Sequence, residues 1–226
     1  MKFLYCHESS PRIYEFPVYS NRVIHKGDPV ALDKSYAYKS YDTGFIGIAA
    51  EDHSGVADDM NPRSNGTSIK IMCSNDAVYE LSSPIYTVTE TYSSPCTETL
   101  IEAEGPFTYD NNESYLVLIK KGEGSTNTDP IGKLRRVSAV IDSGFNDIYD
   151  FTVATGGVAC VGDQYALIPM ISCKKVRALS EDTWNIDYTA STFVCVGVDL
   201  SKIDGNGTPP TVHVKIRNSP LLGISE

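Results

Sequence analysis

Asp28 and Asp163 each follow a glycine at the same place in two similar segments, and a carboxylate at a recurring position is a candidate general acid or base. Catalysis of that kind needs partner groups, and neither segment repeats one. Glycine adopts backbone conformations that other residues avoid, and aspartate bonds neighbouring backbone groups, so Gly-Asp between extended runs is typical of a tight turn or bulge. We predict a structural turn at both aspartates.

Other chemical arrangements are incomplete. Gly124 precedes Gly132-Lys133 at a spacing too long for a phosphate-binding loop, and Leu134 stands where that loop needs Ser or Thr. The acidic loop 199–207 lacks the alternating ligands and final glutamate of a calcium loop, which favours a solvated turn over a bound ion. We predict no enzyme activity and no catalytic, cofactor or metal site. The histidines are scattered and lack ligand spacing: His7, His25, His53 and His213.

An internal repeat organises the chain. Residues 16–32 and 151–167 align without a gap and are identical at seven of seventeen positions, including both Gly-Asp pairs. The order continues downstream, because the segments from Gly44 and Asn65 have counterparts from Phe193 and Asn206. We interpret this as a tandem duplication of one small scaffold.

Strand signals dominate the chain, because alternating or β-branched runs are separated by Gly, Pro, Asn, Asp and Ser. One helical turn is expected, at residues 180–186. The expected fold is all-β, with two tandem, duplicated antiparallel β-barrel or β-sandwich modules of β-tulip type and very little helix. The expected strands are 22–32, 45–50, 67–73, 77–81, 85–92, 115–120, 134–141, 158–160, 165–171, 193–198 and 211–217.

The repeat sets the expected domain limits. A connecting β segment between the modules contains the polar loop 122–130, which is either a long hairpin loop or a flexible linker. The expected parts are an N-terminal arm at 1–15, a first module at 16–90, the connecting segment at 91–150 and a second module at 151–226.

Charge and cysteine usage exclude several partner classes. The 19 basic and 29 acidic residues give a net charge of −10, which argues against nucleic acid. The first residues are too polar for a signal peptide, and no stretch has the length of a membrane helix, so no membrane partner is expected. The six cysteines are expected to be buried free thiols in a soluble protein made in a cytoplasm.

Exposed aromatic residues are the candidate partner-binding side chains. Tyr36, Tyr38 and Tyr41 form a tyrosine-rich loop suited to partner contact, although single surface tyrosines are also ordinary. The N-terminal arm either pairs along a sheet edge or docks on a partner. Its candidate contact residues are Phe3, Leu4, Tyr5 and Tyr14.

Three runs in the first repeat resemble one protein family. They are GDPVAL from Gly27, GFIGIAAEDHSG from Gly44 and a strand that ends at Glu80 and Leu81. This pattern is similar to the small β-rich decoration proteins, also called head-stabilising or cement proteins, of tailed bacteriophage heads. The resemblance covers roughly residues 16–83 well and 151–222 loosely. The matching positions are Gly27, Asp28, Val30, Gly47, Ile48, Ala49, Asp52, Gly55, Val78, Glu80 and Leu81.

The resemblance implies a structural protein of the virion, on the outer surface of the phage head, made in a host bacterial cytoplasm. Its expected partner is the major capsid protein, whose lattice it would stabilise, with self-association on the capsid and a trimer as one arrangement. The family has no catalytic residues to transfer to this chain. Two alternatives stay open: a receptor- or glycan-binding module of a fibre or tail tip, and a tail-tube or connector subunit.

Overall fold

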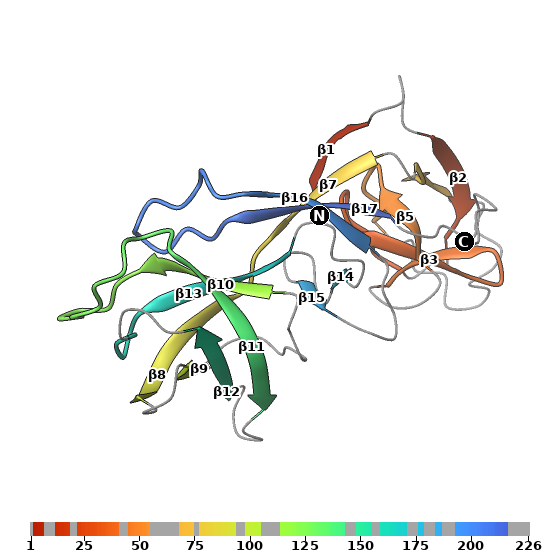
Figure 1. Cartoon of the computed structure of the whole chain (residues 1–226). Coiled ribbons are helices and arrows are strands. Elements are labelled where there is room, and N and C mark those ends of the chain that lie inside the picture. Colours follow the sequence, from red (N-terminus) through yellow and green to blue (C-terminus); the bar gives the residue numbers. More distant parts are fainter. Residues whose placement is uncertain are drawn as a thin grey trace.

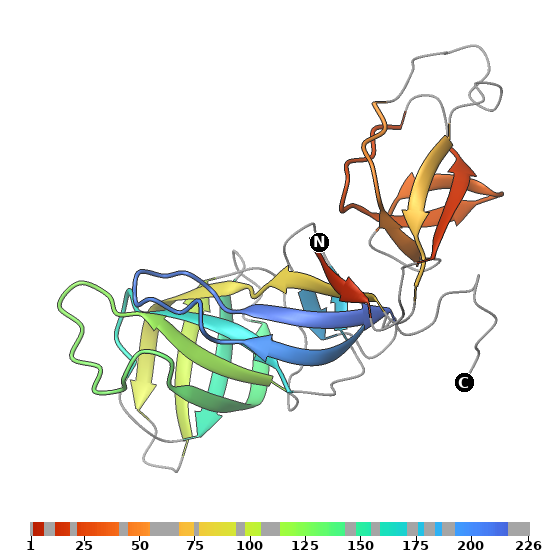
Figure 2. The same cartoon turned by 90° about the horizontal axis from the view of Figure 1, so that it is seen from above.

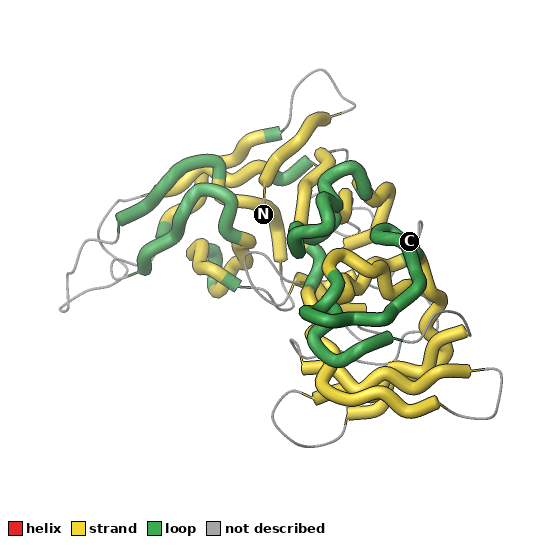
Figure 3. The backbone as a smooth tube through the Cα atoms, turned by 90° about the vertical axis from the view of Figure 1, so that its left-hand side faces the viewer, coloured by secondary structure: helices red, strands yellow, loops and turns green. Residues whose placement is uncertain are grey.

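The protein consists of antiparallel β-structure in three sheets (Figure 1). Every regular element among the described residues is a strand, as the tube view shows (Figure 3). The predicted all-β class is therefore confirmed. The structure, a computed structural model, describes residues 2–6, 12–18, 22–40, 45–54, 68–74, 77–93, 98–104, 114–142, 148–154, 159–170, 176–178, 184–186 and 193–216.

The first unit is a five-stranded sheet, and an isolated parallel bridge between Val18 and Ala37 brings its two edges together. Its apolar core includes Ile24, Ile69 and Ile71, all fully buried. In spatial order its strands are β2 (Ile13–Pro17), β6 (Ser68–Met72), β5 (Phe45–Ala49), β3 (Pro29–Asp33) and β4 (Tyr36–Lys39).

The second unit is a closed six-stranded barrel. Tyr86 and Phe151 pack edge to face inside it, with ring centroids 4.9 Å apart. Its strands, in order around the barrel, are β10 (Ser114–Lys120), β11 (Leu134–Asp142), β12 (Ile148–Ala154), β9 (Glu98–Glu104), β8 (Ile85–Ser93) and β13 (Gln164–Pro169).

The third sheet continues the barrel core, because Tyr79 and Val214 belong to the same apolar cluster as Phe151. Its strands β7 (Ala77–Ser82), β16 (Phe193–Asp199) and β17 (Thr211–Ile216) run between the first unit and the barrel (Figure 2). In spatial order the strands are β1 (Lys2–Cys6), β7 (Ala77–Ser82), β17 (Thr211–Ile216), β16 (Phe193–Asp199), β14 (Val176–Ala178) and β15 (Trp184–Ile186).

The two units share a strand arrangement. In each unit, two strands lie in the sheet between the strand before the Gly-Asp turn (β2 or β12) and the strand after it (β3 or β13). The next strand beyond β3 is β4, and the next strand beyond β13 is β10. In the first unit the intervening strands follow the turn along the chain, whereas in the second they precede it. The two units therefore share a strand order around the Gly-Asp turn but differ in connectivity. The expected downstream counterparts are not equivalent, because β5 and β6 lie in the first unit whereas β16 and β17 lie in the third sheet and not in the barrel.

Four local predictions were wrong. The expected strand 22–32 is a strand only from Pro29, because the Gly-Asp turn bends the backbone before it. Tyr36 and Tyr38, expected in a loop, lie in strand β4. Residues 184–186 form β15, paired with β14, where a helical turn was expected, because cross-strand pairing outweighs a single capping residue. Residues 159–160 lie in the turn before β13 and not in a strand, because the Gly-Asp turn bends the backbone there.

The boundaries between the sheets do not coincide with the boundaries of the expected modules. Residues 85–169 contribute all six barrel strands, so the expected connecting segment and the start of the expected second module lie in one barrel. Loop 122–130 joins β10 to β11, which form an antiparallel pair, and so it is a hairpin loop.

Candidate functional site

The Gly-Asp turn has the same geometry in both units. Gly27 and Gly162 have φ of 93° and 85°, a region that favours glycine. Each aspartate donates its backbone N–H to the carbonyl three residues earlier, at 2.9 Å in both copies. Each Oδ2 accepts the N–H of that same residue, at 2.8 Å from His25 and 2.9 Å from Cys160.

Each turn also locks onto the neighbouring strand. Gly27 donates to the carbonyl of Ala49 and Ala49 donates to the carbonyl of Asp28, both at 2.9 Å. Val88 makes the corresponding pair with the second turn, at 2.8 and 2.9 Å. Because the aspartates are 2% and 0% exposed and their oxygens hold the backbone, these turns are structural, as predicted.

The second turn anchors a distant loop. Asp163 Oδ1 accepts the N–H of Gly122, and its Oδ2 accepts the side-chain amide of Asn127, both at 2.8 Å. The same amide lies 3.0 Å from the hydroxyl of Tyr165, whose pKa is raised to about 12, chiefly by burial. A buried carboxylate with several charge-assisted hydrogen bonds holds the β10–β11 loop in place.

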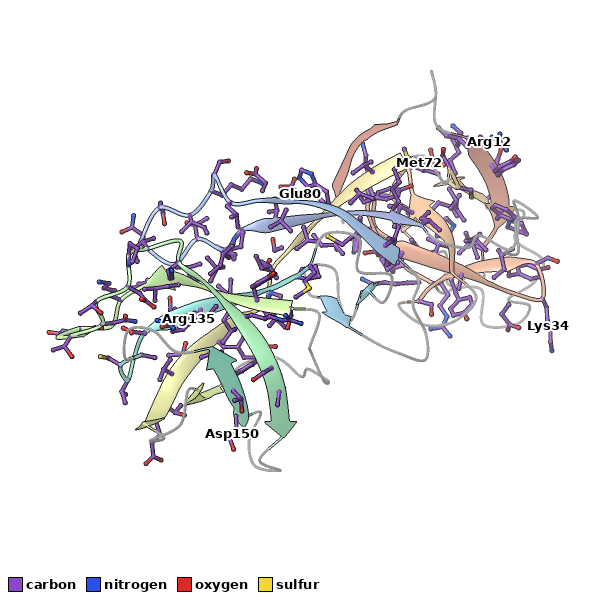
Figure 4. All side chains as sticks on the ribbon, in the orientation of Figure 1. Arg12, Lys34, Met72, Glu80, Arg135 and Asp150 are labelled. Atoms are coloured by element: carbon purple, nitrogen blue, oxygen red, sulfur yellow. The ribbon has the colours of Figure 1, made fainter. Side chains whose placement is uncertain are left out.

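A buried ion pair extends this network. Arg135 donates from Nε to Asp129 Oδ2 at 2.8 Å, with a further contact from its NH2 group. Both side chains are buried, and the backbone N–H of Asp129 donates to the Asn127 side chain at 2.9 Å. Figure 4 shows Arg135 beside β10 within the barrel. The β10–β11 loop is therefore held to the barrel at Gly122, Asn127 and Asp129.

The first unit has a simpler arrangement. Asp28 Oδ1 lies 3.1 Å from Nζ of Lys39, the last residue of β4, and that lysine side chain is 30% exposed. No long loop is fixed by Asp28 in the described part of the first unit. The duplicated turn is thus the common element, and the buried network is specific to the second unit.

The N-terminal candidates Phe3, Leu4 and Tyr5 lie in β1, which pairs with β7 at the edge of the third sheet. Of the two arrangements expected for the arm, the structure contains the pairing along a sheet edge. The outward edge of β1 has no partner strand among the described residues.

The described tyrosine candidates of the first unit lie on its two edge strands, which the Val18–Ala37 bridge brings together. Tyr14 is 44% exposed in β2 at one edge of the first unit, beside Ile13 at 50%. Tyr36 and Tyr38 are half-buried in β4 at the other edge. Tyr41 lies outside the described residues.

Three described cysteines differ in reactivity. Burial raises the pKa of Cys73 to about 12 and that of Cys195 to about 11. Cys160 is half-buried, and its Sγ lies 3.5 Å from the hydroxyl oxygen of Thr126. The pKa of Cys160 is lowered, chiefly because a hydrogen bond from this hydroxyl favours the thiolate. These three are free thiols; Cys73 and Cys195 are buried as expected, whereas Cys160 is only half-buried.

One feature of the barrel was not noted in the sequence. Acidic residues are concentrated in one part of the chain, and strand pairing brings several of them to neighbouring backbone positions in the barrel. Register places Glu102 opposite both Glu90 and Asp150, across β8, β9 and β12. The signal lay in residues 75–113, which contain no Lys or Arg and the acidic residues Asp76, Glu80, Glu90, Glu98, Glu102, Glu104, Asp110 and Glu113.

Within the described ranges, no group of three or more His, Cys, Asp or Glu side chains is suited to hold a metal ion. Among the described residues, no helix has the length and apolarity to cross a membrane. Comparison of the chain with protein-family models, curated proteins and solved structures finds no match.

Proposed function

We propose that this chain is a capsid decoration protein that binds the outside of a tailed-phage head and stabilises the lattice of the major capsid protein. The proposal begins from the motif resemblance and from the way its residues meet in space. It assigns the protein an adhesive task performed by two related β-units.

The observation that carries the proposal is that the first two motif runs meet in the sheet of the first unit; the third run, with Val78, Glu80 and Leu81, lies in β7 of the third sheet. Val30 pairs with Gly47, and the backbone of Ala49 bonds both residues of the Gly-Asp turn. Asp52 accepts the N–H of Lys26, which precedes that turn, at 2.8 Å. Runs of sequence separated by about twenty residues therefore form one unit, which is the behaviour expected of a scaffold motif.

The Gly-Asp turn of the second unit supports the same proposal. Gly162 and Asp163 bond β8 as Gly27 and Asp28 bond β5. A chain with two such units has two surfaces with which to contact a repeating lattice. Two linked contacts gain effective concentration over one, and binding to the assembled shell alone stabilises that shell by mass action.

Co-sedimentation with phage heads tests the proposal. We expect the protein to pellet with mature, expanded heads and to remain in solution with unexpanded heads. Absence from both pellets would contradict the proposal. Binding to a glycan array would favour a receptor-binding module, and rings of the isolated protein would favour a tail-tube or connector subunit.

The arm is tested by a deletion of residues 1–6. This variant removes β1 and leaves β2, which begins at Ile13, intact. If β1 adds a strand to the capsid protein through its outward edge, the variant binds expanded heads more weakly while its circular dichroism stays that of a folded β protein. A matched Tyr14→Ala variant keeps β1 and separates the edge of the first unit from the arm. Unchanged binding by the deletion variant would remove the arm from the proposal.

A further inference from the structure

The loop between β16 and β17 lies on the outside of the barrel, beside β10 and β13 (Figures 1 and 2). Its Ile203 packs on an apolar cluster that includes Val117 of β10 and Ala166 of β13. A Cβ added at Gly205 would lie 3.7 Å from Cγ1 of Ile131, in the segment that leads into β11. The β16–β17 loop is therefore seated on the barrel and on the β10–β11 loop.

Asn206 lies in a bend of this loop and is followed by a glycine. Asn206 is exposed, whereas Gly207 is half-buried and has a φ of 101°. Glycine has no side chain to block the approach of its own backbone nitrogen to the side-chain carbonyl carbon of a preceding asparagine. Within the described part of the chain, no hydrogen bond engages the N–H of Gly207. This nitrogen is therefore available to react with the Asn206 side chain.

The carboxylate of Asp204 holds Asn206 in this bend. Oδ1 of Asp204 accepts the backbone N–H of Asn206 at 2.8 Å, and Oδ2 accepts the side-chain amide of Asn206 at 3.3 Å. The hydroxyl of Thr208 donates to the same Oδ2 at 3.1 Å. The pKa of Asp204 is lowered, chiefly by the backbone N–H of Asn206, so the carboxylate is ionised at neutral pH. The amide nitrogen of Asn206 therefore lies beside a negative charge.

From these contacts we propose that Asn206 is a site of spontaneous deamidation. The backbone nitrogen of Gly207 forms a bond to Cγ of Asn206, the Cγ–Nδ2 bond breaks, and ammonia leaves with the proton of the Gly207 N–H. The carboxylate of Asp204 stabilises the positive charge that Nδ2 gains as it leaves. Water then opens the five-membered imide at one carbonyl to give aspartate, or at the other to give isoaspartate. Water is the only co-reactant.

Asn127 provides a comparison within the same chain. It is 4% exposed, and its amide donates to Oδ2 of Asp163 at 2.8 Å and lies 3.0 Å from the hydroxyl of Tyr165. Deamidation there would break both buried contacts, and the β-branched Thr128 that follows hinders the approach of its backbone nitrogen. In the folded protein the reaction is therefore selective for Asn206 over Asn127. The modification requires no capsid, so it stands or falls separately from the proposed function.

The modification loosens the β16–β17 loop from the barrel. In either product an anionic oxygen replaces Nδ2 beside the Asp204 carboxylate, so an attraction becomes a repulsion. Isoaspartate also adds one methylene to the main chain directly before Gly207. A Cβ added at Gly207 would lie 2.8 Å from Oε1 of Gln164 and 3.5 Å from Cδ of Lys120, so the backbone is already close to these side chains. The longer main chain therefore moves away from β10 and β13.

Peptide mass spectrometry of the folded protein, aged at mildly alkaline pH, tests the site. Trypsin releases residues 203–215, in which Asn206 is the one asparagine, and residues 122–133, which contain Asn127. We expect peptide 203–215 to gain the mass difference between a hydroxyl and an amino group, and fragmentation to place isoaspartate at residue 206. Asp204 also precedes a glycine, but its isomerisation would leave the mass unchanged. An unaged sample digested in parallel corrects for reaction during digestion.

The matched control is Asn206→Gln, because glutamine would have to form a six-membered ring, and we expect its peptide to react at least about tenfold more slowly. The Asn65–Gly66 dipeptide lies outside the described residues and falls in a separate tryptic peptide, 64–70. An unchanged mass of peptide 203–215 after ageing, or an equal rate of mass gain in peptide 122–133, would overturn the proposal.

Hydrogen exchange across residues 199–210 tests the loosening of the loop. The variant Asn206→Asp carries the new charge without the additional methylene. We expect the backbone of the loop to exchange faster in the isoaspartate form than in this variant, and faster in this variant than in the fresh wild type. Equal exchange in all three proteins would show that the modified loop stays on the barrel and would overturn this consequence.

Discussion

Asp163 and Asp28 are repeat counterparts that differ in how much of the fold depends on them. Asp163 accepts bonds from Cys160, Gly122 and Asn127, whereas Asp28 accepts one from the His25 backbone and pairs with Lys39. The repeat predicted the turn common to both, because Gly and Asp recur together. The Asn127 contact was not predictable, since it joins residues 36 positions apart.

Replacing each aspartate by alanine should separate these roles. Asp163→Ala leaves three donors without their acceptor in a buried site, and we expect the free energy of unfolding to fall by about 3 kcal/mol or more. Asp28→Ala is expected to cost about 1–2 kcal/mol, because Lys39 can turn to solvent. Urea unfolding measures both. Equal losses would contradict the anchoring role of Asp163.

Lys34 and Ser35 form the turn between β3 and β4 with φ of 47° and 75°. Two-residue hairpins with positive φ at both positions favour Asn-Gly. We expect Lys34→Asn with Ser35→Gly to stabilise the protein by about 1 kcal/mol, since the strain of two side chains in this region is relieved. The exposed tip position of Lys34 is visible in Figure 4.

The measurement is the urea midpoint. Glu123→Gly is the control, because Glu123 is exposed and its φ is not positive, so a glycine there adds only entropy to the unfolded chain. The control should lower the midpoint. A hairpin variant that also lowers it would show that the β3–β4 turn is not strained.

Cys160 should be the first of the three described thiols to react with iodoacetamide, because its lowered pKa gives more thiolate near neutral pH. As pH falls through this pKa the thiolate is protonated and labelling slows, at a lower pH than for an ordinary cysteine. Thr126→Val should raise the pKa and shift the labelling curve to higher pH. Peptide mass spectrometry locates the label, and earlier labelling of Cys73 or Cys195 would contradict the assignment.

At the scale of elements, most strands followed from alternation and turn residues. Strands β5 to β8, β10, β11, β13, β16 and β17 lie close to their predicted positions. The strands β2, β4, β9, β12, β14 and β15 were not predicted, and β1 was expected only as one of two arrangements of the arm. These strands are defined by their pairing with neighbouring strands. The local hydrophobic pattern predicts the buried strands, whereas the other strands form because they pair with neighbouring strands.

Gly47 is the element-scale test of the motif. A Cβ at this position would overlap the carbonyl oxygen of Met72 and lie 2.9 Å from Ile71 Cγ2, so β5 and β6 would have to separate. We expect Gly47→Ala to lower the free energy of unfolding by about 1–3 kcal/mol. The control is Gly197→Ala in β16, where the nearest atom would be 3.6 Å away. Similar urea midpoints for the two variants would contradict the close packing of β5 on β6.

At the scale of the whole molecule, the sequence predicted a duplicated all-β chain but not its connectivity. Both Gly-Asp segments lead into equivalent strands, β3 and β13. The two strands between β2 and β3 follow the turn in the chain, whereas the two strands between β12 and β13 precede it. Sequence similarity reports which segments share a local conformation. It does not report which strands close a barrel, since that depends on pairings such as β10 with β13.

The candidate contact surfaces were also predicted only in part from the sequence. The sequence indicated the exposure of Tyr14 and the extended form of the arm. The Val18–Ala37 bridge that brings the edge strands of Tyr14 and Tyr36 together was not predictable, because it joins residues far apart in the sequence.

The central claim is that the protein stabilises an assembled head, and the most direct measurement is the temperature at which expanded heads rupture and release DNA. With the protein bound at saturation, we predict a higher rupture temperature than for bare heads of the same preparation, and a return to the bare value when the protein is removed. An unchanged rupture temperature at demonstrated saturation would contradict the claim.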